Sequence, residues 1–310
     1  GKAVKDANKA DFTVPSGELG TFYYYAVASG EGLESATSKV VEVTVKAVPK
    51  SLTLTSDYPY TVPNASSNAY GGVTYAVKQG TQMQLRALDE NGNETPIIWK
   101  VGGAYGGKLD TETGVYTVTS ASYTYVTAVS ALDPDVTSGQ KLIDVKFYQI
   151  SDYYKNQTVR LNADGQTVKT ASVIGGINGY NIWEVKYPDG VAEITSDLTT
   201  KPGSLGMNVL RPGKVEVTLT LDIGPEDAPK LTDTAVLNVT GVAVENADGG
   251  FSKAYLELTS ENAAPTMQLK AIPEEGRSIA SWTSANEDVA TVAQDGTVTF
   301  VGCGLATITA

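Results

Sequence analysis

The sequence predicts an all-β protein made of tandem β-sandwich domains, and three observations lead to this prediction. Thr, Val, Gly, Ser and Tyr are abundant, and these residues are typical of strands and tight turns. Alternating apolar and polar residues recur along the chain, whereas no stretch has the apolar spacing of an amphipathic helix. A segment centred on a tryptophan occurs three times. A chain of 310 residues has room for about two to four domains.

The overall composition argues against several kinds of partner. The net charge is −12 and the 23 basic residues are scattered singly, whereas nucleic-acid binding needs clustered Lys and Arg. No apolar run approaches the ~18 residues of a membrane span. An acid excess of this size favours a soluble monomer. We therefore expect a monomer that binds no nucleic acid and has no membrane-inserted segment.

The residues that most enzymes and metal sites need are scarce. The chain has no histidine, which removes Ser–His–Asp and Cys–His nucleophiles and histidine-based metal sites. It also has no glycine-rich phosphate loop between a strand and a helix. Paired carboxylates could still hydrolyse glycosides, but a sandwich of ~90 residues seldom provides the cleft. We expect a non-enzymatic protein without a cofactor.

Two smaller features also favour a structural interpretation. The run 89–94 carries closely spaced oxygen side chains, but its Asn91-Gly92 pair is typical of a hairpin turn and not of a calcium loop. Cys303 is the only cysteine, so no disulfide can form within the chain. Because it lies between two glycines just before an apolar strand, we expect a small buried side chain and no reactive thiol. We expect no metal site.

The C-terminal segment carries a specific pattern over residues 282–310. Trp282 is followed by a Ser/Asn-rich turn, a Val-Ala-Thr-Val strand at 289–292, an Asp-Gly turn at 295–296, and a Gly-Leu-Ala-Thr-Ile strand at 304–308. This pattern closely resembles the bacterial Ig-like domain, group 2. The resemblance implies an immunoglobulin-like sandwich and a bacterial protein of the cell surface or the extracellular space.

Two further copies of this pattern lie upstream. The strand Met83-Gln-Leu-Arg-Ala-Leu88 has a sister in Met267-Gln-Leu-Lys-Ala-Ile272, and a tryptophan follows each Met after 16 and 15 residues. A more divergent copy is centred on Trp183, 84 residues after Trp99 and 99 before Trp282. Since each tryptophan recurs at the same place in its repeat, we predict three buried core rings and no sugar-stacking platforms.

These repeats divide the chain into four predicted domains. The stretches 22–28 and 39–45 resemble the last two strands of a fibronectin type III-like module, a kind of module that trails many bacterial carbohydrate-active enzymes. The junctions lack long Ser/Gly/Pro tracts, which predicts a semi-rigid, elongated array. The predicted domains are a partial fibronectin type III-like module at 1–47, an Ig-like sandwich at 48–147, a divergent one at 148–240, and a group 2 sandwich at 241–310.

An insertion at residues 56–75 departs from the family pattern, which needs only a few residues here. It carries two prolines and the tyrosines Tyr58, Tyr60, Tyr70 and Tyr75. One interpretation is a ligand-binding surface on which a glycan or peptide stacks against the rings. The other is a loop that packs its tyrosines against its own sandwich. The sequence leaves both open.

Two functions are compatible with these features. The first is a non-enzymatic stalk or adhesion region of a bacterial cell-surface protein, with a glycan or a host or matrix protein as its partner. The second is a carbohydrate-binding accessory region of a secreted polysaccharide-active enzyme, which the module-like start at 1–47 and the inserted tyrosines favour. Both functions place the chain outside the cell.

Overall fold

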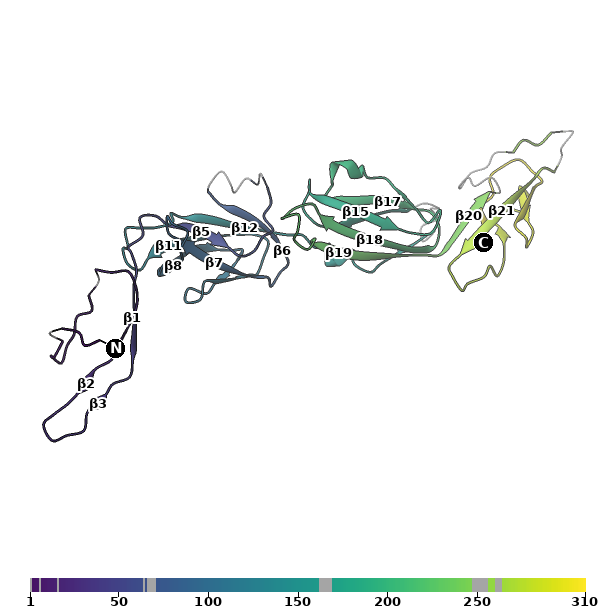
Figure 1. Cartoon of the computed structure of the whole chain (residues 1–310). Helices are drawn as coiled ribbons and strands as arrows, with labels where there is room; N and C mark the ends of the chain where they lie inside the picture. Colours follow the sequence, from purple (N-terminus) through teal and green to yellow (C-terminus); the bar gives the residue numbers. More distant parts are fainter. Residues whose placement is uncertain are drawn as a thin grey trace.

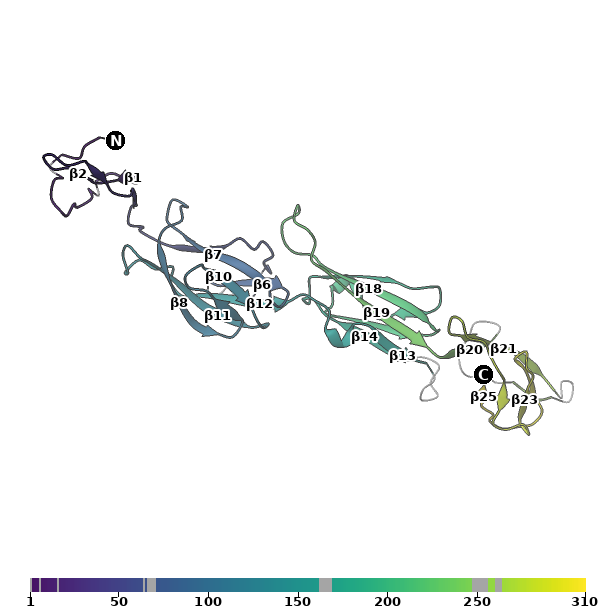
Figure 2. The ribbon, with the colours of Figure 1, turned by 90° about the horizontal axis from the view of Figure 1, so that it is seen from below.

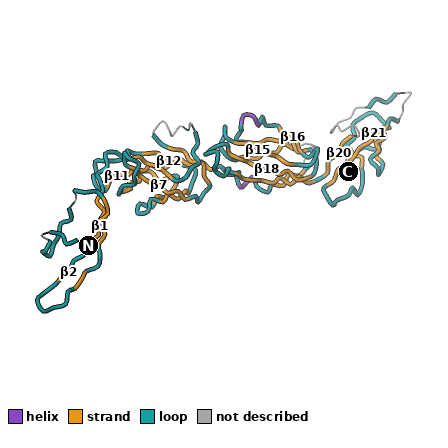
Figure 3. Tube along the Cα trace, viewed as in Figure 1, coloured by secondary structure: helices purple, strands orange, loops and turns teal. Residues whose placement is uncertain are grey.

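The computed structural model is all-β, as the sequence predicts. It describes residues 2–5, 7–15, 17–63, 65, 71–161, 169–246, 256–259 and 264–310. Within these ranges the helical elements are two short 3₁₀ turns, η2 (Asp152–Tyr154) and η3 (Leu198–Thr200). Three Ig-like sandwiches and an N-terminal ribbon follow one another in chain order (Figures 1 and 3). A view turned by 90° shows the same extended row, so the array is elongated (Figure 2).

The first sandwich consists of two four-stranded sheets. One has the order β5-β7-β10-β9, with strands β5 (Thr53–Ser56), β7 (Gln82–Leu88), β10 (Val115–Val118) and β9 (Gly107–Leu109). The other has the order β6-β12-β11-β8, with strands β6 (Val73–Val77), β12 (Lys141–Phe147), β11 (Tyr123–Ser130) and β8 (Ile97–Ala104). Alternate residues of β7 (Met83, Leu85 and Ala87) are buried between the sheets, as a period of two requires.

The second sandwich repeats this plan with four strands facing three. Its larger sheet has the order β13-β19-β18-β15, with strands β13 (Gln157–Arg160), β19 (Thr232–Thr240), β18 (Gly213–Leu221) and β15 (Asn181–Lys186). The smaller has the order β14-β17-β16, with strands β14 (Lys169–Ile174), β17 (Ser204–Val209) and β16 (Ala192–Ile194). In both of these sandwiches an early strand pairs in parallel with the last one, β6 with β12 and β13 with β19.

The third sandwich contains the group 2 pattern. Its larger sheet has the order β20-β21-β24-β23, with strands β20 (Val242–Asn246), β21 (Thr266–Pro273), β24 (Thr297–Phe300) and β23 (Ala290–Val292). The smaller pairs β22 (Thr283–Ser284) with β25 (Ile308–Thr309).

A hydrogen-bonded turn beneath the tryptophan fixes the centre of the first sandwich. The Gln84 side-chain amide donates to the carbonyls of Leu85 at 3.0 Å and Thr113 at 2.8 Å. The turn then passes through Gly114 with a φ of +75°, a conformation that favours glycine. A Cβ at Gly114 would lie 3.3 Å from Trp99 Nε1, so the indole sits directly over the turn.

The third sandwich has the same arrangement at equivalent positions. The Gln268 amide donates to Leu269 O at 3.0 Å and to Asp295 O at 2.7 Å. Gly296 has a φ of +87°, and a Cβ there would lie 3.2 Å from Trp282 Cζ2. The two sister strands of the sequence therefore have equivalent side-chain hydrogen bonds, each within its own sandwich, as well as the same pattern of apolar residues.

The three tryptophans are buried, which confirms their predicted role as core residues. The exposed fractions of Trp99, Trp183 and Trp282 are 8%, 6% and 7%. Trp183 packs in the largest apolar cluster that the described residues form, and its Nε1 donates to Pro202 O at 2.8 Å. The indole nitrogen thus has a partner inside the core, which removes the cost of burying a polar group.

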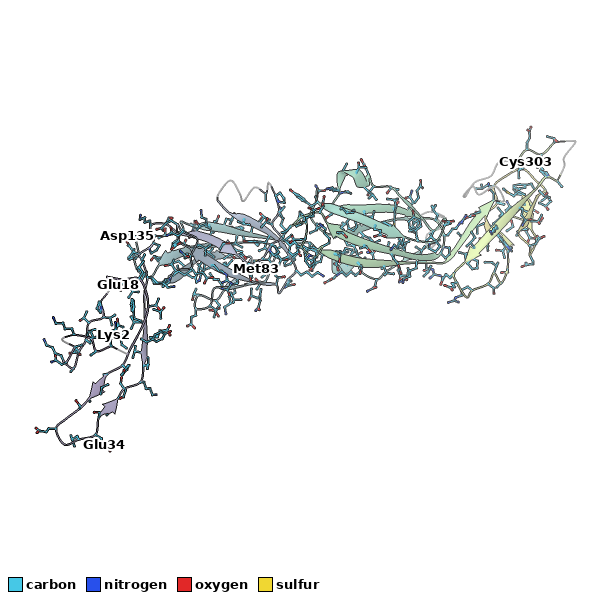
Figure 4. The ribbon with its side chains drawn as sticks, viewed as in Figure 1. Lys2, Glu18, Glu34, Met83, Asp135 and Cys303 are labelled. Atoms are coloured by element: carbon cyan, nitrogen blue, oxygen red, sulfur yellow. The ribbon has the colours of Figure 1, made fainter. Side chains whose placement is uncertain are left out.

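Cys303 is exposed, so the expectation of a buried side chain is wrong (Figure 4). The reason lies in the two flanking glycines. A Cβ at Gly302 would collide with Asp288 O, and one at Gly304 would lie 2.7 Å from Val289 Cγ2. Because the glycines are the positions that press against the neighbouring segment, the residue between them projects into solvent.

The N-terminal part is a ribbon without a core among its described residues. Strand β1 (Gly20–Tyr24) pairs with β4 (Val41–Val45), and β2 (Val27–Ala28) pairs with β3 (Ala36–Thr37). None of the described residues from 2 to 47 is buried. Its likeness to a fibronectin type III-like module stays a prediction.

Candidate functional site

The start of the tyrosine insertion is an extra extended segment along β6. Val62 N donates to Thr74 O at 2.8 Å, and Ala76 N donates to Tyr60 O at 3.0 Å. Residues 57–63 therefore continue the β6-β12-β11-β8 sheet beyond its edge strand. These backbone hydrogen bonds fix which face of the segment each tyrosine occupies.

Three of the four inserted tyrosines pack together. The ring centroids of Tyr58 and Tyr60 are 5.4 Å apart and those of Tyr58 and Tyr75 are 6.1 Å apart, both in edge-to-face geometry. Tyr60 and Tyr75 are 9% and 4% exposed, and the Tyr58 hydroxyl donates to Ala76 O at 2.9 Å. Burial raises the pKa of the Tyr58 and Tyr75 hydroxyls, so both hydroxyls remain protonated. Tyr70 lies outside the described residues.

The cluster continues into the second sandwich. Its buried members come from both sides of the junction: Tyr60, Val62 and Ala76 from the first sandwich, and Tyr148, Ile177, Leu221 and Ile223 from the second sandwich and the junction leading to it. We call this cluster the first joint. The burial favours packing over ligand binding for Tyr60 and Tyr75, but the packing reaches beyond the loop's own sandwich.

Hydrogen bonds and one close approach lock the first joint. The Tyr60 hydroxyl donates to Pro229 O, and in the opposite direction the Tyr180 hydroxyl donates to Pro63 O at 2.6 Å. The Tyr60 ring also lies on the backbone of Gly224, where a Cβ would be 2.7 Å from Tyr60 Cδ1. Each sandwich therefore supplies both a ring and a receiving surface.

On one side of the first joint, the Asp233 carboxylate binds residues of the segment that connects the two sandwiches. Asp233 Oδ2 accepts from Ile150 N at 2.7 Å and from Lys155 Nζ at 3.0 Å. Lys78 of the first sandwich lies 4.0 Å from Asp233 Oδ1 and 5.3 Å from the centre of the Tyr148 ring. Burial, with Asp233 and Tyr60 nearby, raises the pKa of the Tyr148 hydroxyl. The connection between the sandwiches is thus anchored from both domains.

A second group of tyrosines is exposed on the outer face of the first sandwich. The ring centroids of Tyr105 and Tyr123 are 5.3 Å apart and those of Tyr123 and Tyr125 are 5.4 Å apart. Tyr105 and Tyr123 are 61% and 40% exposed. Tyr105 covers the backbone of Gly103, where a Cβ would lie 2.7 Å from Tyr105 Cε2. We call these three residues the tyrosine row, and sequence analysis did not single them out.

The acidic run at 89–94 is a turn. Asp89 Oδ1 accepts from Asn91 N at 2.8 Å and from Asn93 N at 2.9 Å, and these backbone hydrogen bonds lower the pKa of Asp89. Within the described ranges, no group of three or more Cys, Asp or Glu side chains is arranged to hold a metal ion. The same part of the chain contains no helix of the length and apolarity that crossing a membrane requires.

Comparison with protein families supports the resemblance seen in the sequence. Residues 260–310 match the family described as bacterial Ig-like domain (group 2). This match includes the whole of the 282–310 pattern and confirms its assignment. No curated protein matches the sequence significantly.

Several solved structures are similar to this chain. Domains 4 and 5 of the S-layer protein SbsC are 15% identical, with a TM-score of 0.22, and the match covers 63% of this chain and 100% of that one. An intimin fragment in complex with the intimin-binding domain of its translocated receptor is 13% identical, with a TM-score of 0.34 and coverages of 64% and 67%. Invasin, a bacterial integrin-binding protein, is 16% identical, with a TM-score of 0.27 and coverages of 93% and 60%. Scores this low carry no argument about function.

Proposed function

We propose that this chain is a non-enzymatic spacer region of a bacterial cell-surface or extracellular protein, which holds an adhesive or other functional domain at a distance. The observation that carries the proposal is the first joint, a buried cluster shared by two consecutive sandwiches. A row of domains keeps a distance only if its connections resist folding back. A cluster with interlocked rings and hydrogen bonds from both sides provides that resistance.

The connection itself supports the same proposal. Strand β12 ends at Phe147, Tyr148 N then donates to Val77 O at 3.2 Å, and Ile150 forms a bridge with Gly175. The chain therefore leaves one sheet and enters the next sandwich within residues 148–150, and each of these three residues takes part in a backbone hydrogen bond or bridge. An acid excess, with a net charge of −12, limits association between copies and suits a monomeric spacer.

Small-angle X-ray scattering of the whole chain tests the spacer proposal. We expect the mass of one chain and an asymmetric pair-distance distribution with a long tail, because domains joined end to end separate most atom pairs along one axis. Measurements over a range of protein concentrations serve as the control for self-association. A symmetric, compact distribution would show that the sandwiches fold back on each other, and a doubled mass would refute the monomer.

Glycan binding is a second candidate function, and the tyrosine row favours it. Exposed aromatic faces with hydroxyl groups at their edges suit the C–H faces and hydroxyls of sugars. Tyr105 offers such a face because its other side rests on Gly103. In this version of the accessory-region hypothesis, the site lies on the sheet face and not in the 56–75 insertion.

Affinity electrophoresis in gels that contain neutral polysaccharides tests glycan binding. We expect Tyr105→Ala and Tyr123→Ala to weaken retardation about tenfold, the order of one lost aromatic contact. Tyr153→Ala is the matched control, since Tyr153 is 77% exposed and its ring lies 5.0 Å from that of Tyr154, away from the row. Equal retardation of all three variants and the wild type would reject the site, as would no retardation of the wild type.

A further inference from the structure

The connection between the second and third sandwiches, which we call the second joint, is built differently from the first. Strand β19 passes into β20 through one residue, Gly241. Its φ is +105°, and a Cβ there would lie 2.9 Å from Leu161 O, so the position requires glycine. Gly241 N donates to Glu274 Oε1 at 2.7 Å. The direction of the chain thus changes at a single backbone position.

The apolar contribution that the described residues of the third sandwich make to this joint is small. Ala243 is fully buried in the core cluster of the second sandwich, and Ile272 packs against that cluster. The two residues are paired across β20 and β21, so they form one compact contact. The first joint, by contrast, buries the rings of Tyr60 and Tyr148 among five other residues. An apolar contact as small as that of the second joint holds position but offers little resistance to rotation about Gly241.

One ion pair supplies the resistance to rotation that the apolar contact lacks. Arg211 of the second sandwich binds Glu245 of β20 through two contacts, Nε to Oε1 at 2.5 Å and Nη2 to Oε2 at 2.9 Å. Both ends are held in place. The guanidinium lies against the Gly190 backbone, where any Cβ would collide with it, and the Glu245 side chain is only 5% exposed. A two-contact Arg–carboxylate pair fixes orientation as well as distance.

We propose that the second joint is the bend point of the array and that the Arg211–Glu245 pair is the strut that sets its angle. The proposal deepens the spacer function and rests on it for its biological meaning. The first joint has many independent contacts, so losing one polar pair there leaves the angle in place. At the second joint, Arg211–Glu245 is the one ion pair between described residues of the two sandwiches, and the Glu274 hydrogen bond is made to Gly241 itself, the residue about which the domains rotate. Because Glu245 is buried, added salt screens the pair only weakly, and the strut persists at physiological ionic strength.

Spin-label distance measurements on the whole chain test this inference. The exposed native Cys303 labels the third sandwich, and Glu184→Cys on β15 places an exposed label on the second. We expect a single narrow distance distribution in the parent protein. Glu245→Gln, which keeps the shape but removes the charge, should abolish the narrow peak. Arg211→Lys should do the same, because it keeps the charge but loses the fork geometry.

Two controls separate this inference from the spacer function. Asp222→Asn removes the Lys201–Asp222 pair, which is equally short at 2.5 Å but lies within the second sandwich, and should leave the distribution narrow. A second label pair, Lys108→Cys and Glu184→Cys in a Cys303→Ser background, reports the first joint. That distribution should stay narrow in Glu245→Gln.

The outcomes are distinct. A Cys303 to residue 184 distribution that stays narrow in Glu245→Gln and Arg211→Lys would overturn the strut, whereas the spacer function would stand. A broad distribution already present across the first joint in the parent protein would overturn the spacer function instead. Thermal unfolding that matches the parent protein confirms that the variants remain folded.

Discussion

Replacing Trp183 with alanine lowers the free energy of unfolding of the second sandwich by about 3–5 kcal/mol, the cost of removing a large ring from a packed core. The ring is 6% exposed and belongs to a cluster that draws on both sheets of its sandwich. The substitution also removes one of the two hydrogen bonds that Pro202 O accepts, the other coming from the Asn181 side-chain amide at 2.8 Å. Denaturant unfolding followed by hydrogen exchange, resolved by segment, measures the loss within residues 148–240.

Two variants calibrate this result. Trp183→Phe keeps most of the ring and loses the hydrogen bond, so its cost should fall well below that of alanine. Tyr153→Ala removes an exposed ring from the same sandwich and should change the free energy by less than about 0.5 kcal/mol. If Trp183→Ala unfolds at the same denaturant concentration as the parent protein, its ring does not hold the core.

Replacing Tyr60 with alanine separates the unfolding of the first sandwich from that of the second, at a cost of about 3 kcal/mol. The ring is 9% exposed and packs on Gly224, and its hydroxyl donates to a carbonyl of the second sandwich. Differential scanning calorimetry of the whole chain should show one joint transition for the two sandwiches in the parent protein. The variant should show two transitions, because the shared cluster no longer couples them.

A change at Gly224 tests the same contact from the second sandwich, and Tyr60→Phe is the matched control. Gly224→Ala places a Cβ 2.7 Å from the Tyr60 ring and should uncouple the sandwiches from the other side of the joint. Tyr60→Phe keeps the ring and loses one hydrogen bond, so it should cost only about 1 kcal/mol and preserve the joint transition. If Tyr60→Ala destabilised the first sandwich alone and left the second unchanged, the ring would belong to its own sandwich and no coupling would exist.

Local patterns in the sequence predict the strands and the core well. The alternation of Met83, Leu85 and Ala87 predicts which face of β7 is buried, because side chains on a strand alternate strictly. The expectation of a small buried side chain fails at Cys303, because the two flanking glycines are the residues that lie closest to Asp288 and Val289 of the neighbouring segment. The sequence does not reveal at which positions a neighbouring segment comes too close for a side chain, and such positions are the ones that glycine occupies here.

The joints lie beyond what local patterns can reveal. The 56–75 insertion stands out in the sequence because of its length and its tyrosines. Its partners, however, are far along the chain. The Tyr60 hydroxyl donates to the carbonyl of Pro229, 169 residues later. The carbonyl of Pro63 accepts from the Tyr180 hydroxyl, 117 residues later. Apolar residues inside loops, such as Ile223 between Asp222 and Gly224, are the one signal that could have pointed to a buried joint. The Arg211–Glu245 strut has no such signal, since single charges of either sign are scattered throughout the chain.

Residual dipolar couplings measured across the first two sandwiches of the whole chain test the first joint most directly. If the joint is locked, the couplings from residues of both sandwiches fit one alignment tensor with the relative orientation seen in the structure. The couplings are averaged over every orientation that the two domains adopt, so they report a hinge even when it is only partly populated. Two tensors of different magnitude would show that the sandwiches move independently, and the locked first joint would then be refuted.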